Sequence, residues 1–150
     1  MLVYLDSSIV ARAYLPDEPG HEQAAALMYG TEHLVVTASW TVVEVTSALV
    51  RARTGRAGDA GALLALLAED TGEAGPLTLL RVDSERLEIR ATEIVREHAL
   101  RSLDALHVAV AELAARPLVE PAERIAFASR DEAQQTAAVK RGFWPLDRAP

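Results

Sequence analysis

The chain opens with Leu2-Val3-Tyr4-Leu5-Asp6-Ser7-Ser8, the stretch that decides its fold. The first four of these residues are apolar or aromatic, a pattern that predicts a short strand buried on both faces. The strand pattern stops at Asp6, and an apolar helix pattern follows through Ile9 and Tyr14. Because a carboxylate at the end of a buried strand lies at the rim of the core, we expect Asp6 to face a crevice.

Further short apolar runs predict more strands, with helix patterns between them. Strands are predicted over residues 34–37, 77–82 and 125–128, and a short edge strand over residues 143–146, where Pro145 would lose a ladder hydrogen bond. Helices are predicted over about residues 7–15, 21–29, 40–54, 60–69, 84–98, 103–115 and 131–141. Buried strands alternating with helices predict a single α/β domain over residues 1–150, with a short parallel sheet of four to five strands and helices on both faces.

The composition is that of an ordinary globular protein, with half of the 150 residues hydrophobic and a quarter charged. Cysteine is absent, which excludes disulfides and cysteine-based zinc sites and fits a reducing, cytoplasmic location. We expect no secretion signal and no membrane span, because no apolar run is long enough. The net charge of -7 argues against binding of nucleic acid through a broad basic surface, although an acidic metal site could still handle a phosphate chain.

Three acidic residues follow predicted strands, and ligands of a parallel sheet bind outside the C-terminal ends of its strands. Asp6 follows the first strand, Glu44 lies in the helix after the second, and Asp131 follows the fourth. Asp104 comes after a break between two helices, and the sequence does not place it at the same edge. Carboxylates gathered at one edge suit a hard divalent cation, which activates water and neutralises phosphate oxygens.

Each of these acids also has a purely structural interpretation. Acidic side chains favour helix N-termini, where they accept from free N–H groups and complement the helix dipole. Asp6 has the position of an N-cap, and Thr41 with Glu44, like Ser129 with Glu132, has the spacing of a capping box. Capping does not require the acids to converge at one edge of the sheet, so their shared location favours a metal site.

Four motifs together resemble the pattern of the PIN-domain family. They are Asp6-Ser7-Ser8, Glu44 within residues 40–45, Asp104 within residues 102–109, and Ser129-Arg130-Asp131. Within that family, the length and helix layout resemble the VapC toxins of bacterial and archaeal toxin–antitoxin pairs. The resemblance covers nearly the whole chain, and the ordered set of motifs is more specific than any one of them.

The resemblance implies a metal-dependent endoribonuclease that hydrolyses RNA with metal-activated water and is held inactive by a small cognate antitoxin protein. The matching acidic quartet is Asp6, Glu44, Asp104 and Asp131. Its three aspartates would hold Mg²⁺ or Mn²⁺, and Glu44 would orient or deprotonate the attacking water. Ser8 and Ser129 would hold carboxylates or metal waters in place. The products would carry a 5′-phosphate and a 3′-hydroxyl.

Two features depart from the family pattern, and one histidine lies close to the motifs. The connector over residues 116–123 is longer than usual, and Arg130 places a bulky cation beside the fourth acid. Both are expected to alter substrate fit rather than the acidic quartet. His107 follows Asp104 by three residues and is predicted to pack beside the site, because a hard metal prefers oxygen ligands.

Some patterns leave two interpretations open. Arg51, Arg53 and Arg56 either complement the C-terminal dipole of their helix or form a small phosphate-binding patch. The leucines at positions 63, 64, 66 and 67 suit core burial, or else a homodimer surface. The alternative function is a non-catalytic PIN-like binding or regulatory module, against which the full acidic set argues.

Overall fold

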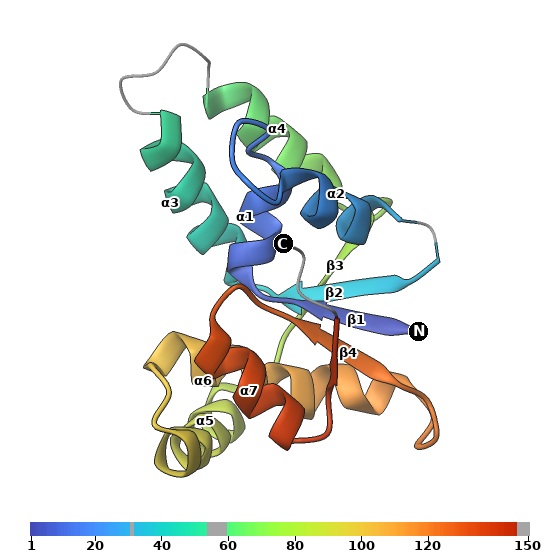
Figure 1. Cartoon of the computed structure of the whole chain (residues 1–150), viewed down its shortest axis with the longest axis vertical. Helices are drawn as coiled ribbons and strands as arrows, with labels where there is room; N and C mark the ends of the chain where they lie inside the picture. The colour runs from blue at the N-terminus through green and yellow to red at the C-terminus, as the bar shows by residue number, and fades with distance from the viewer. Residues whose placement is uncertain (31, 54–59, 147–150) are drawn as a thin grey trace.

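A computed structural model describes residues 1–30, 32–53 and 60–146, in which five parallel strands form one sheet (Figure 1). The strands are β1 (Leu2–Leu5), β2 (Leu34–Ala38), β3 (Leu77–Leu80), β4 (Ile125–Ala128) and β5 (Trp144–Pro145). Their order is β3-β2-β1-β4-β5, so the opening strand lies at the centre of the sheet and all four of its residues are buried. The predicted α/β domain with a short parallel sheet is confirmed.

Helices cover both faces of this sheet (Figure 1). They are α1 (Ser7–Ala13), α2 (His21–Tyr29), α3 (Thr41–Arg53), α4 (Ala60–Asp70), α5 (Ser84–His98), α6 (Ser102–Val110) and α7 (Glu132–Lys140). Because successive strand residues point to opposite faces, Val3 and Leu5 pack with α1–α4, whereas Leu2 and Tyr4 pack with α5–α7. Among the described helices, none is long and apolar enough to cross a membrane.

The largest departure from the predicted elements follows α6. The predicted helix over residues 103–115 begins at Ser102, but its last turns form a π-helix over Ala111–Ala115. The connector then starts with a 3₁₀ turn over Arg116–Leu118. The edge strand β5 is only two residues long and includes Pro145, which an outermost strand tolerates.

The sequence leaves two interpretations open for the leucines of residues 63–67 and for the arginines of residues 51–56, and the fold decides between them only in part. Leu67 is buried in the core, Leu63 and Leu64 are half-buried against it, and Leu66 is exposed. Core burial therefore explains most of the leucine pattern, and a homodimer surface stays a prediction. Arg51 is exposed, whereas Arg56 and the side chain of Arg53 lie outside the described residues.

A partly buried ion-pair network joins α5, the π-helix and the end of α7. Glu112 accepts from Arg90 Nε at 2.6 Å and from Arg141 Nε at 2.7 Å, and its side chain is 8% exposed. Burial alone would raise the pKa of Glu112, but the hydrogen bonds from Arg141 and Arg90 lower it below its ordinary value. The ionised carboxylate therefore stabilises the face of the fold opposite α1–α4.

Replacing Glu112 with glutamine should destabilise the protein by about 1–3 kcal/mol at neutral pH, because two guanidinium groups lose their shared anion. Because the pKa of Glu112 is lower in the folded protein than in the unfolded chain, its carboxylate stabilises the fold at any pH above the unfolded-state pKa. This stabilisation is lost as the pH falls through the folded-state pKa. The difference in unfolding free energy between parent and Glu112→Gln should therefore shrink below about pH 4.5.

Chemical denaturation across pH measures this difference. Glu93→Gln serves as the matched control, since Glu93 also accepts from Arg90 but is much more exposed. We expect that control to change stability by less than about 0.5 kcal/mol. A deficit of Glu112→Gln that stays constant down to low pH would contradict the assigned role.

Candidate active site

Asp6 is a buried carboxylate held from several sides at the end of β1. Its backbone N–H donates to Ala128 O at 2.9 Å, which extends the pairing of β1 with β4. Its Oδ2 atom accepts from Ser8 N at 3.2 Å and from Ser129 Oγ at 3.3 Å, and the residue is 5% exposed. Asp6 is thus the N-cap of α1 and also faces the connection after β4. The Ser8 hydroxyl accepts from Arg130 N at 3.1 Å, so it holds that same connection.

Ser129 links Asp6 to the fourth acid. While its hydroxyl donates to Asp6, it accepts from Asp131 N at 3.0 Å. The Asp131 side chain in turn accepts from Gln134 N at 2.9 Å, which makes Asp131 the N-cap of α7. The capping interpretation of Ser129 with Glu132 is therefore wrong, because the aspartate two residues later begins the helix.

Glu44 lies in the first turn of α3, after the second strand, as the sequence predicts. The Trp40 carbonyl accepts from Glu44 N at 3.2 Å, so α3 begins there. The Thr41 hydroxyl bonds to the Thr37 hydroxyl at 2.8 Å, which ties the start of α3 to β2. From this position the Glu44 carboxylate reaches the imidazole of His107.

His107 connects two of the acids from inside the core. It is 1% exposed, and its Nε2 atom lies 2.8 Å from Glu44 Oε2 and 3.5 Å from Asp6 Oδ1. Its Nδ1 atom lies 2.8 Å from the Tyr4 hydroxyl. Because a carboxylate only accepts, Nε2 carries the hydrogen of the bond to Glu44. The sequence places His107 beside the site, but this chain of bonds could not be predicted, because its partners lie 63 and 103 positions away.

Asp104 is the acid that the sequence could not place at this edge, and two of the other acids affect its pKa. It lies in the first turn of α6, whose N-cap is Arg101 with no side-chain capping bond. Burial raises the pKa of Asp104, and the negative charges of Asp131 and Asp6 raise it further. Asp104 therefore lies close enough to Asp131 and Asp6 for their negative charges to disfavour its ionised form.

This arrangement suits a divalent cation in charge and donor type, because hard cations prefer carboxylate oxygens and would relieve the repulsion. Within the described ranges, no three side chains of histidine, aspartate or glutamate form a ready-made set of metal ligands. The ends of β1 and β4 lie beside α1 and α7, and α6, which carries Asp104, packs against α7 (Figure 1). Metal binding by Asp6, Asp104 and Asp131 stays a prediction, which the raised pKa of Asp104 supports.

Comparison with known protein families gives one clear result. The model of the PIN domain family matches residues 3–139 of the chain. The match includes β1 through β4 and α1 through most of α7, and hence every acid described above. A search among curated proteins finds no significant match.

The position of Asp104 can be tested by neutralising it in metal-free protein. A residue that only complements a helix dipole stabilises the fold, whereas a carboxylate repelled by Asp131 and Asp6 destabilises it. Asp104→Asn should therefore raise the melting temperature in EDTA, by about 2–4 °C for each kcal/mol of repulsion removed. Thermal melts followed by circular dichroism measure this shift.

Asp83→Asn is the matched control, because Asp83 is the N-cap of α5 and accepts from Arg86 N. We expect this variant to melt slightly below the parent, since it loses only a favourable charge at a helix N-terminus. If Asp104→Asn also melts below the parent in EDTA, Asp104 does not share the repulsive site.

Proposed function

The chain belongs to the PIN domain family, and on that premise we propose that it is a metal-dependent endoribonuclease, the toxin of a toxin–antitoxin pair. The family assignment supports hydrolysis of nucleic acid as the general activity. The feature that supports the proposal further is the raised pKa of Asp104, which burial and the negative charges of Asp131 and Asp6 cause at the edge where parallel sheets bind ligands.

Each acid has a role that follows from its surroundings. Asp6, Asp104 and Asp131 would hold Mg²⁺ or Mn²⁺, an ion that neutralises phosphate oxygens and lowers the pKa of water. Glu44 is suited to accept the proton of the attacking water, because its side chain is 23% exposed and can reach solvent. His107 bonds to one oxygen of Glu44 and is itself held by the Tyr4 hydroxyl, which orients the carboxylate before substrate binds.

A non-catalytic binding module is the less favoured function. A partly buried carboxylate that two acidic neighbours repel, as Asp104 is, destabilises the folded protein unless a cation binds there. Capping accounts for Asp6 and Asp131, but Asp104 makes no capping bond and its pKa is raised. A non-catalytic binding module would not need a carboxylate that destabilises its fold, so the acidic residues favour an enzyme.

Asp6→Asn tests the catalytic site while preserving the fold, because asparagine caps a helix as well as aspartate does. The parent should cleave RNA with Mg²⁺ or Mn²⁺ and stop in EDTA, and Asp6→Asn should lose activity by about 100-fold or more. Gel analysis of labelled RNA measures the rates, with Asp83→Asn as the control that keeps full activity. Full activity of Asp6→Asn, or cleavage in EDTA, would refute the mechanism.

The same acidic site motivates a proposal about regulation. A protein with a net charge of -7 and clustered aspartates attracts a cationic partner, so the cognate antitoxin would cover the site with a basic side chain. Co-expression with a small protein encoded beside this one should yield a stable complex that does not cleave RNA. A purified complex that cleaves at the rate of the free chain would rule out this form of inhibition.

A further inference from the structure

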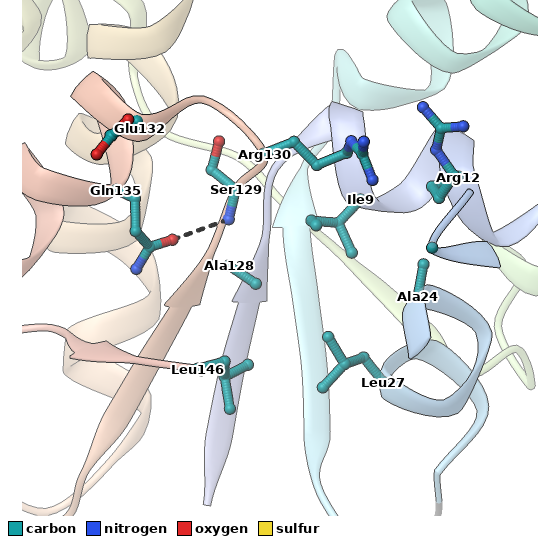
Figure 2. Close-up of a pocket in the computed structure, with 11 residues that line it drawn as sticks. Ile9, Arg12, Ala24, Leu27, Ala128, Ser129, Arg130, Glu132, Gln135 and Leu146 are labelled. Atoms are coloured by element: carbon teal, nitrogen blue, oxygen red, sulfur yellow. Dashed lines mark hydrogen bonds between the residues drawn. The ribbon is translucent and has the colours of Figure 1, made fainter. Parts of the chain in front are cut away.

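A pocket of about 200 Å³ lies beside the acidic site, between α1, α2 and the connection from β4 to α7 (Figure 2). Its apolar lining residues are Ile9, Ala24, Leu27, Ala128 and Leu146. Pockets that enclose drug-sized ligands occupy about 300–1,000 Å³. This smaller pocket therefore suits one unit of a longer ligand, such as a single nucleotide of a nucleic-acid strand.

Two arginines line the same pocket, from different parts of the chain. Arg12 comes from α1 and Arg130 from the connection after β4, and their guanidinium groups lie at the same end of the pocket in Figure 2. Glu132 also lines the pocket, but Figure 2 shows its carboxylate beyond Ser129, on the side away from both guanidinium groups. The end of the pocket that holds the two arginines is therefore suited to an anion.

The two arginines differ in how open they are to a ligand. Arg12 Nη1 donates to Glu18 at 2.6 Å, whereas Arg12 Nε is buried and has no hydrogen-bond partner among the described residues. Arg130 Nη1 makes a long bond of 3.4 Å to Pro19 O, and the residue is exposed. Arg12 therefore contributes the charge of a guanidinium that Glu18 already pairs, whereas the exposed Arg130 is open to an anion in the pocket.

The pocket is fixed in position relative to the acids. Ser129 lines the pocket and donates to Asp6, and Arg130 directly precedes Asp131 in the chain. The backbone N–H of Arg130 also donates to Ser8 Oγ, next to the cap of α1. A strand whose phosphate lies at Asp6 and Asp131 can therefore place a neighbouring phosphate at Arg130.

We propose that this pocket binds the phosphate of an RNA nucleotide next to the one at the acidic site. The proposal rests on the proposed ribonuclease function and adds a substrate-binding site to it. The guanidinium fork matches the geometry of phosphate oxygens. The apolar lining then contacts the sugar or base of that nucleotide, as sequence-tolerant sites for single strands do. Arg130 gives an otherwise acidic protein a local cation for the strand.

Binding in EDTA tests the pocket without any dependence on catalysis. The probe is a short fluorescein-labelled oligouridylate, and fluorescence anisotropy gives its Kd at several salt concentrations. Arg130→Gln should raise Kd by about 3- to 10-fold. It should also reduce the slope of log Kd against log salt by about 0.7, the value for one phosphate contact on a single strand. Arg96→Gln, on the exposed face of α5, should change neither quantity.

A second pair of variants isolates Arg12 from its ion pair. Arg12→Gln removes the guanidinium, whereas Glu18→Gln removes only its partner. The first should weaken RNA binding, and the second should leave it unchanged or tighter. The pocket proposal is wrong if the parent binds RNA but both Arg130→Gln and Arg12→Gln have the same Kd and salt slope as the parent. The ribonuclease proposal would stand in that case. If the parent neither binds nor cleaves RNA, both proposals fall.

Discussion

The structure of this site depends on how one buried carboxylate is held. Asp6 ends the central strand, where its backbone pairs with β4 and its side chain accepts from Ser8 N and the Ser129 hydroxyl. A buried charge without such partners would cost several kcal/mol. The bonds to Asp6 therefore fix the start of α1 and the connection after β4 relative to each other. Arg130 and Asp131 belong to that connection, so the same bonds fix their positions.

Once Asp6 is held, the other charges follow from the topology. Glu44 reaches the site after β2, and His107 joins it to Asp6 from within the core. Asp104 arrives on α6 and is destabilised there by burial and by its acidic neighbours. The fold tolerates this repulsion because other contacts stabilise it, among them the pairing of Glu112 with Arg90 and Arg141. A cation bound among these carboxylates would relieve the repulsion of Asp104 by Asp131 and Asp6, as expected of a metal site.

Much of this arrangement could be predicted from local sequence patterns. The run Leu2–Leu5 predicts a buried central strand, and acids that follow parallel strands must meet at one edge of the sheet. The position of Asp104 could not be predicted, because it depends on how α6 packs rather than on a strand end. The bond of His107 to Glu44 was missed for a related reason. Nothing near His107 in the sequence marks a partner 63 residues away.

The most direct test of the central claim is a crystal structure of the protein grown with Mn²⁺, with the ion located by its anomalous scattering. We predict a peak within ligand distance of the carboxylates of Asp6, Asp104 and Asp131, and its loss in Asp6→Asn crystals grown in the same way. A structure with these carboxylates well ordered and no anomalous peak among them, at saturating Mn²⁺, would contradict it.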